Sequence, residues 1–468
     1  MASATPAGRL LDRIKTTCSP WLVLPSGRRA AAWWVGTRLV MLGLWVVTGL
    51  HSQGDVSYYY DNLHALLSGQ AGLDQTLPEY PTPLIWILAV PYLLGWGNSI
   101  GFHIAFTVLF IATDALMTTV CWRTARRAGT NPGPAAWFWI VFVIAIGPIS
   151  YMRLDLLTAA LSTAAIVALI GRKPGAAGAL IATGAAIKLW PALLWPATLV
   201  DRRSWRRAGL GFVLAGGGLA AAAWAFAGWD RLVSPLAWQS DRGLQIESVW
   251  ATPLMLARLF DPGRWTVIHS QYNAFEIVGP GTSALLTASS GATLVGGVVM
   301  AVLYIGWLRR REHTVIEAGC LMIIATLIMI VTNKTFSPQY MIWLGGPVVG
   351  LLTISARQPP SRPAQSHPAG TPPEAPLTLA RRIALWTLVL TVLTQLVYPT
   401  VYDWLIDWRH GLTWLATIVL TLRNGLIVYF LVRLVRFAAR SVSGRVKIPD
   451  QVQDDAGRAD RNPGSSPR

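Results

Sequence analysis

Long runs of apolar residues recur along the whole chain, and short polar or basic segments separate them. A helix needs about 20 apolar residues to cross a bilayer, and most runs approach that length. They lack the alternation that marks membrane-barrel strands, so we expect helices. The pattern predicts an all-α polytopic membrane protein with about twelve transmembrane helices. The expected spans are residues 32–50, 101–122, 134–151, 154–171, 174–188, 190–200, 208–228, 284–308, 314–332, 338–356, 383–400 and 412–436.

Basic residues gather between the spans and set the expected topology. Cytosolic loops carry an excess of Lys and Arg, so every cluster is placed in the cytosol, together with both chain ends. This gives a cytosolic N-terminal segment (1–31), a transmembrane domain (32–436) and a tail (437–468) expected to be disordered. The opening segment lacks the apolar core of a signal peptide, so the first span is expected to stay as an anchor. The clusters are Arg28/Arg29, Arg123/Arg126/Arg127, Arg172/Lys173, Arg202/Arg203/Arg206/Arg207, Arg309–Arg311, Arg381/Arg382 and Arg433/Arg436.

The segment PLIWILAVPYLLGWG (83–97) is apolar but does not fit this count. As a span it would move the cluster at Arg123 to the outer side, and Pro91 interrupts it. We therefore predict an apolar helix that lies on the outer face, inside an outer loop of residues 51–100. This loop contains four acidic residues and no Lys or Arg, which agrees with an outer location.

Three other regions shape the expected organisation. Residues 229–283 form the second large outer loop, and the Pro-rich segment 357–380 is expected to be a flexible cytosolic linker. The spans 174–188 and 190–200 are short and contain prolines. Broken helices at membrane depth are tolerated where they line a cavity or are buried in protein.

Composition agrees with this class and narrows the chemistry. Hydrophobic residues make up 53% of the chain and charged residues 13%, against about 25% charged in soluble proteins. The net charge of +17 lies in clusters between spans without interleaved aromatic residues, so we expect no nucleic-acid partner. Cys18, Cys121 and Cys320 are too far apart in the sequence to suggest a metal or disulfide motif, and no nucleotide-binding motif is present. No metal or cofactor is expected.

Asp55 follows the first span directly and precedes the sequence VSYYYDNLHALLSG. A carboxylate beside an apolar surface can act as a general base, but an acid before a helix can also be its N-cap. Asp61 is expected on the solvated face of the same helix, and Tyr58–Tyr60 as anchors at the membrane interface. Glu79, in the bend EYPTP, either faces a cavity or belongs to an architectural turn.

Two further groups of polar residues lie at the expected outer side. Arg153 and Asp155 in YMRLD and Lys188 in AIKLWP form either an ion pair with a snorkelling lysine or a phosphate site. The second group lies on two expected loops, QSDRGLQIESVWATP and NKTFSPQY. It consists of Arg242, Glu247, Lys334 and Gln339. Ionisable residues at membrane depth are expensive, so these residues are candidates for substrate binding.

The ordered motifs resemble those of the actinobacterial polyprenol-phosphate-mannose-dependent α-mannosyltransferases, integral-membrane enzymes of the GT-C fold class. The matching stretches are GDVSYYYDNLHALLSG, the YP.P bend at 80–83, R.D at 153–155, IKLWPALL at 187–194 and KTFSPQYMIWL at 334–344. The bend departs from the family, where YPP is commoner than EYPTP. The resemblance covers residues 30–435.

The resemblance implies a GT-C-like helical bundle and an active site on the outer face of the plasma membrane. Its donor would be a polyprenyl-phosphate sugar, most simply mannose, and its acceptor a cell-envelope glycolipid or glycan. Asp55 would be the general base of an inverting reaction, with Lys188 or Arg153 stabilising the departing phosphate. A transferase for arabinose or another sugar on the same carrier stays open. The rival class is a transporter or flippase of a lipid-linked sugar, which would favour inverted repeats that the sequence does not show.

Overall fold

The computed structural model describes residues 27–48, 54–200, 202, 204–310, 313–355 and 376–442. Seven helices within these ranges are long and apolar enough to cross a membrane, and five shorter helices are also apolar. The long ones are α2 (Gly27–Thr48), α5 (Ser99–Arg127), α10 (Trp205–Asp241), α12 (Thr282–Arg309), α13 (Val315–Thr332), α15 (Pro376–Gln395) and α17 (Thr413–Val442). The shorter ones are α4 (Pro83–Leu94), α6 (Gly133–Ile146), α8 (Asp155–Ile170), α9 (Pro174–Ile187) and α14 (Tyr340–Ser355). The predicted all-α polytopic membrane class is confirmed.

Every expected span except one coincides with an apolar α-helix. The exception, 190–200, is a 3₁₀-helix, η2 (Trp190–Thr198), which includes Pro196. Its two prolines remove backbone donors and favour the tighter helix over a continuous α-helix. The segment predicted to lie outside the count of spans is α4, and this helix continues through Pro91 instead of breaking there.

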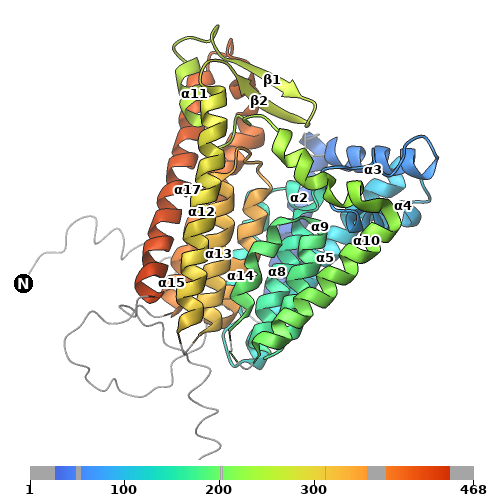
Figure 1. Cartoon of the computed structure of the whole chain (residues 1–468), viewed down its shortest axis with the longest axis vertical. Coiled ribbons are helices and arrows are strands. Elements are labelled where there is room, and N and C mark those ends of the chain that lie inside the picture. Colours follow the sequence, from blue (N-terminus) through green and yellow to red (C-terminus); the bar gives the residue numbers. More distant parts are fainter. Residues whose placement is uncertain are drawn as a thin grey trace, which may run out of the picture.

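Smaller elements gather at one end of the bundle, the upper end in Figure 1. They include α3 (Gly54–Leu67), α11 (Thr252–Arg258) and a hairpin of strands β1 (Thr266–Ser270) and β2 (Ala274–Val278). The hairpin was not predicted, and neither was the continuation of α10 as far as Asp241 into the expected loop 229–283. A kink at Gly228, which has φ 80°, redirects this last part of α10. The remaining short elements are α7 (Ile149–Met152), η3 (Leu396–Thr400) and α16 (Tyr402–Ile406).

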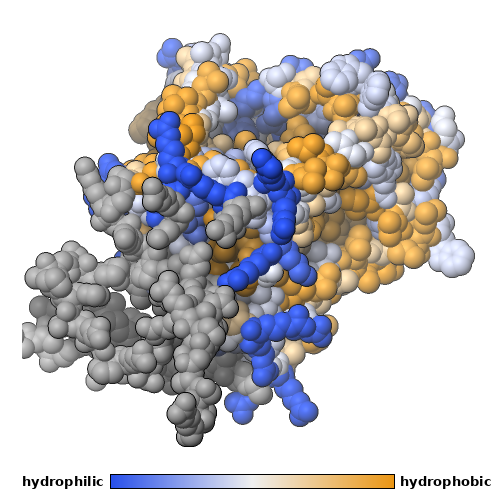
Figure 2. All heavy atoms as spheres, turned by 60° about the horizontal axis from the view of Figure 1, so that its bottom comes forward, coloured by the Kyte–Doolittle hydropathy of each residue, from blue (hydrophilic) through white to orange (hydrophobic). Residues whose placement is uncertain are grey.

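Basic residues mark the opposite end of the bundle. Arg126 and Arg127 lie in the last turn of α5, and Arg309 lies in the last turn of α12, which starts just after the hairpin. Figure 2 turns this lower end toward the viewer and shows strongly hydrophilic residues there beside an apolar flank. The helix directions agree with the expected topology, whose sidedness stays a prediction. The helix α17 continues to Val442, past the expected domain boundary at 436, while most of 357–380 and of the tail lies outside the described residues.

The centre of the bundle is formed by α13 and α14, whose residues are almost all buried. Close contact with neighbouring helices depends on glycine. A Cβ on Gly346 of α14 would collide with the backbone of Ala159 in α8, and one on Gly178 of α9 with the backbone of Ala208 in α10. Small residues of this kind let membrane helices approach closely. Cys121 and Cys320 are buried and free within the helices, as packing residues.

Candidate active site

A cavity of about 580 Å³ opens at the hairpin end, where several chain segments converge. Its floor and walls come from the start of α3, the bend 79–81, the α7–α8 turn, Lys188–Trp190, the end of α10 and the loops around Glu247 and Gln339. The hairpin contributes His269 and residues 271–275. We call this cavity the chamber. The ionisable acids and bases that line it are Asp55, Glu79, Glu247, Arg153, Lys188 and Arg242, with His269 on the hairpin side.

Asp55 lies in the first turn of α3, one residue inside the helix instead of in front of it. A carboxylate in this position interacts favourably with the helix dipole. Its side chain forms an ion pair with Arg153, and both groups face the chamber. The ion pair expected within the turn, between Arg153 and Asp155, is therefore not the one formed. Asp61 is exposed on the same helix, as predicted.

Lys188 reaches the chamber while bound to a carboxylate behind it. Its Nζ lies 2.7 Å from Oδ1 of Asp155, which also accepts a hydrogen bond of 2.5 Å from Nε1 of Trp343. Asp155 is fully buried and does not line the chamber. The ammonium also lies over the rings of Tyr80 and Trp343, at 5.6 and 5.5 Å from their centroids. Asp155 thus holds Lys188, which places the cation at the chamber wall.

Arg231 holds the bend that brings Glu79 to the chamber, a role that the sequence did not reveal. Its buried guanidinium donates hydrogen bonds to the carbonyls of Leu73, Thr76, Leu77 and Tyr80, at 2.9–3.1 Å. Burial raises the pKa of Glu79, an effect that a hydrogen bond from Tyr58 partly offsets. A single arginine therefore shapes a loop that contains no basic residue of its own.

The loop after α10 supplies Arg242 and Glu247. Arg242 lines the chamber, and its buried Nε has no hydrogen-bond partner among the described residues. One carboxylate oxygen of Glu247 lies 3.7 Å from the fully buried Arg423 of α17. Burial raises the pKa of Glu247 to about 7, against the opposing effects of Arg423, Tyr402 and Arg153.

The loop between α13 and α14 separates two predicted site residues. Gln339 lines the chamber, and its Oε1 is buried with no partner among the described residues. Lys334 instead donates to the carbonyl of Ser240 at 2.7 Å and does not line the chamber. Gln245 ties the two loops together, because its Oε1 accepts from the amide of Phe336 at 2.8 Å. Lys334 was predicted to bind substrate, but in the structure its ammonium joins this loop to the end of α10 instead.

Aromatic rings form much of the remaining wall, including tyrosines that were predicted to anchor the membrane interface. Tyr58 lines the chamber, and Tyr59 is buried with its hydroxyl 3.2 Å from that of Tyr80. The expectation that Tyr58–Tyr60 anchor the membrane interface is wrong for these two. Ligand cavities combine such apolar and aromatic walls with a few placed polar groups. The other rings that line the chamber include Trp190, Trp238, Tyr272, Phe275, Tyr340, Trp343, Tyr398 and Tyr402.

A second cavity, about 720 Å³ and almost entirely apolar, lies among α4, α5, α8 and α9. We call it the groove. It adjoins the chamber at two places along the chain: Ile187 lines the groove and Lys188 the chamber, and Pro83 lines the groove two residues after Pro81 lines the chamber. Within the described residues, no group of three or more His, Cys, Asp or Glu is arranged to hold a metal ion.

Comparison with known proteins identifies a family. Glycosyltransferase family 87 matches residues 77–333, more than half of the chain. This range contains every residue of the chamber named above from Glu79 to Phe275, but not Asp55. No curated protein matches the sequence. The fold is similar to that of ArnT from Cupriavidus metallidurans bound to undecaprenyl phosphate, with a TM-score of 0.41 and 14% identity over 88% of this chain and 78% of that one. The apo state of ArnT gives a TM-score of 0.32 with the same identity and coverage.

Proposed function

This chain belongs to glycosyltransferase family 87, and we propose that it moves a sugar from a polyprenyl-phosphate donor to a cell-envelope glycolipid or glycan. We further propose that the sugar is mannose. The observation that carries the proposal is the chamber itself. Its 580 Å³ lies within the range of small-molecule sites, and it places one acid, Asp55, beside cations suited to phosphate.

The two adjoining cavities support a lipid-linked donor. The polyprenyl chain is purely apolar and would lie in the groove, whose lining is almost entirely apolar. The sugar and phosphate would lie in the chamber, where Lys188 stands at the junction and Arg242 offers a buried donor without a partner among the described residues. Arg and Lys bind phosphate through charge-assisted hydrogen bonds. Such a donor enters sideways from the bilayer and needs no nucleotide.

We assign the general base to Asp55. In the proposed step, an acceptor hydroxyl oxygen attacks the anomeric carbon of the donor sugar, and Asp55 takes the hydroxyl proton. The bond between the anomeric carbon and the phosphate oxygen breaks, and polyprenyl phosphate leaves with the electron pair. Cations at the chamber wall stabilise the charge that develops on this leaving group. Direct attack inverts the anomeric configuration.

The choice of mannose rests on the resemblance of the motifs, and the same motifs would suit another sugar on this carrier, such as arabinose. The outer-face location in the plasma membrane rests on the basic clusters at the opposite end of the bundle. Membership of a glycosyltransferase family favours transfer over the transporter alternative.

Purified protein in lipid nanodiscs should consume radiolabelled polyprenyl-phosphate mannose and form a labelled product with a membrane glycolipid extract. The anomeric configuration of the product, read by NMR, should be opposite to that of the donor. A parallel reaction with the arabinose donor tests the sugar. Absence of label transfer from every polyprenyl-phosphate sugar would refute the proposed donor class.

Asp55→Asn tests the base, because the amide keeps the size of the side chain but cannot take a proton. We expect turnover to fall by about two to four decades while the protein stays folded and binds donor. Asp61→Asn is the matched control on the exposed face of the same helix and should leave turnover nearly unchanged. Near-normal transfer by folded Asp55→Asn would move the assignment to Glu247, since Asp155 does not reach the chamber.

A further inference from the structure

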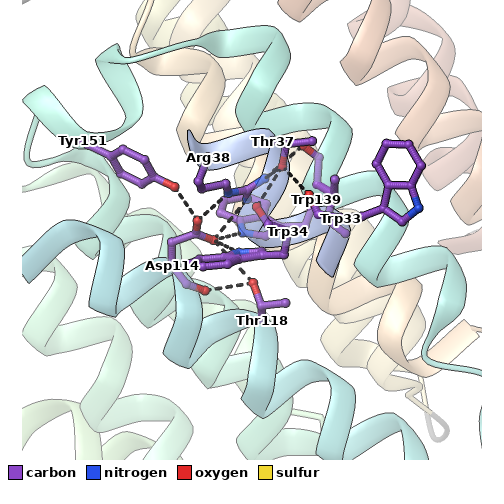
Figure 3. Close-up of polar contacts among 9 residues, drawn as sticks. Trp33, Trp34, Thr37, Arg38, Asp114, Thr118, Trp139 and Tyr151 are labelled. Atoms are coloured by element: carbon purple, nitrogen blue, oxygen red, sulfur yellow. Dashed lines mark hydrogen bonds and ion pairs between the residues drawn. The ribbon is translucent and has the colours of Figure 1, made fainter. Parts of the chain in front are cut away.

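A polar cluster lies inside the bundle where α2, α5, α6 and α7 meet, away from the chamber lining (Figure 3). At its centre is Asp114 of α5, which is fully buried. Arg38 of α2, only 3% exposed, donates from Nε to Oδ2 at 3.0 Å and from Nη2 to Oδ1 at 3.4 Å. A charged pair at membrane depth is expensive, so it is a functional candidate by default.

Two other helices bind the same carboxylate. Trp139 of α6 donates from its indole nitrogen to Oδ1 at 2.6 Å, and Tyr151 of α7 donates its hydroxyl to Oδ2 at 2.5 Å. Arg38 also donates to the carbonyl of Ile140 in α6 at 3.2 Å. A single carboxylate thus fixes α2, α6 and α7 to α5. Each of these partners is buried, so the geometry is held by packing as well as by hydrogen bonds.

One of these helices, α7, leads directly to a residue of the proposed reaction. Tyr151 precedes Arg153 by two residues, and Arg153 is the first residue after α7. Arg153 in turn forms an ion pair with Asp55, which lies in the first turn of α3. The cluster therefore holds the chain segment that delivers Arg153 to the chamber, together with the Asp55 that is paired with it.

We infer that Asp114 is a positioning residue for the Asp55–Arg153 pair, acting on Arg153 through Tyr151 and on Asp55 through its ion pair with Arg153. This inference rests on the proposed function for its effect on turnover. A purely structural role predicts only a loss of stability. A positioning role predicts in addition that disturbing the cluster displaces the Asp55–Arg153 pair and lowers kcat. Misplacement of a reacting group by about 1 Å can cost roughly a hundredfold in rate.

Tyr151→Phe tests the inference with the smallest change, because it removes one hydroxyl and keeps the ring. The matched control is Tyr304→Phe. Tyr304 is also buried, and its hydroxyl donates to the carbonyl of Leu193 at 2.9 Å, away from the chamber lining. We expect Tyr151→Phe to lower kcat about tenfold or more with little change in donor KM, and Tyr304→Phe to change kcat by less than about twofold.

A second matched pair changes the carboxylates themselves. Glu317, near the opposite end of the bundle, has partners like those of Asp114, with Arg310 at 2.5 Å, Ser441 at 3.1 Å and Trp307 at 3.4 Å. Asp114→Asn and Glu317→Gln should lower thermal stability by similar amounts. Only Asp114→Asn should lower kcat. Should Asp114→Asn fail to fold, Tyr151→Phe still decides the matter.

Two further measurements separate positioning from general loosening. In an Arg153→Lys background, the effect of Tyr151→Phe on kcat should shrink to about twofold or less, since coupled residues are not additive. Hydrogen exchange should rise at residues 54–60 in Tyr151→Phe and not in Tyr304→Phe, whether or not the protein transfers a sugar. An unchanged exchange rate at 54–60, or an equal loss of kcat in both backgrounds, would overturn the inference. Raised exchange at 54–60 in Tyr151→Phe, combined with a wild-type protein that transfers no sugar, would instead refute the proposed function alone.

Discussion

Replacing Lys188 should affect both folding and donor use, because its ammonium pairs with the buried Asp155 and also lines the chamber. Its side chain is 16% exposed toward the chamber, while its counter-ion Asp155 is completely buried 2.7 Å away. Sequence reasoning alone predicts that Lys188→Ala weakens donor use more than folding. The structure changes this expectation. Lys188→Ala also removes the counter-ion of the buried Asp155 carboxylate, which keeps only the hydrogen bond from Trp343.

The size of the folding effect follows from the burial of this pair. Removing one partner of a buried ion pair costs about 3–5 kcal/mol, because the other charge stays buried. We expect about 3 kcal/mol here, at the lower end, since Lys188 is partly exposed. Adding Asp155→Asn to Lys188→Ala removes the stranded charge. The double variant should therefore regain most of the lost stability.

Donor use should behave differently from stability. A hydrogen bond to a charged group contributes about 1.5–3 kcal/mol, so loss of the ammonium should raise donor KM about tenfold to a hundredfold in both variants. Thermal unfolding in detergent and donor titration of the transfer reaction measure the two effects separately. Equal instability of the single and double variants would refute the explanation based on Asp155. Normal donor KM in the stable double variant would show that Lys188 does not bind phosphate.

Three other outcomes follow from the same chamber. Arg242→Ala should raise donor KM by a similar factor with little loss of thermal stability, because its Nε makes no hydrogen bond among the described residues; exposed Arg264→Ala is the control. Because the pKa of Glu247 is about 7, raising the pH from 6 to 8 ionises this residue and adds negative charge beside the donor phosphate. Donor KM should therefore rise roughly threefold to tenfold over this range. Glu247→Gln should abolish this pH dependence. A cysteine at Ser270 should be labelled on intact cells and one at Ser361 should not; labelling at Ser361 alone would reverse the topology.

The helices could be predicted because their signals are local. Lipid requires a minimum apolar length and an internally bonded backbone, and both constraints can be read from one segment at a time. The exclusion of 83–97 from the spans rests instead on the charge asymmetry between loops and stays a prediction. The partial failure came at 190–200, where apolar composition predicted a span but Pro191 and Pro196 favour a 3₁₀-helix.

The ion pairs could not be predicted, because they depend on which segments meet in space. Arg153 and Asp155 are two residues apart, and a pair between them was the simplest expectation. The chain is extended at Arg153, with φ −133° and ψ 150°, and α8 starts at Asp155. This change of direction sends the guanidinium to Asp55 and leaves Asp155 beneath Lys188 and Trp343.

The hairpin was missed for a different reason. Its signal was present in WTVIHS, a run with β-branched residues, and in the turn at Asn273, whose φ is 52°. The surrounding charges and the neighbouring helices favoured the simpler assignment of a loop. As a result, the predicted site lacked the hairpin residues that line the chamber, His269 and 271–275.

In the proposed reaction, the balance of charge in the chamber would link donor binding to release of Asp55, the proposed base. Three acids and three bases line it: Asp55, Glu79 and Glu247 against Arg153, Lys188 and Arg242. Arg153 is already paired with Asp55, and we propose that a donor phosphate replaces the carboxylate at this guanidinium. That exchange would free Asp55 to take a proton at the moment when the donor arrives.

The Asp55→Asn variant tests this linkage independently of turnover. Since a neutral amide competes less well for Arg153, the variant should bind donor more tightly than the wild type, by roughly threefold to tenfold, the scale of one weakened charge contact. Arg153→Lys should reduce this gain, because its single ammonium cannot bind phosphate bidentately. Calorimetry with a polyprenyl-phosphate sugar measures both. Weaker donor binding in Asp55→Asn would mean that the carboxylate holds the donor sugar itself, and Arg153 would then serve to orient Asp55 and not to capture phosphate.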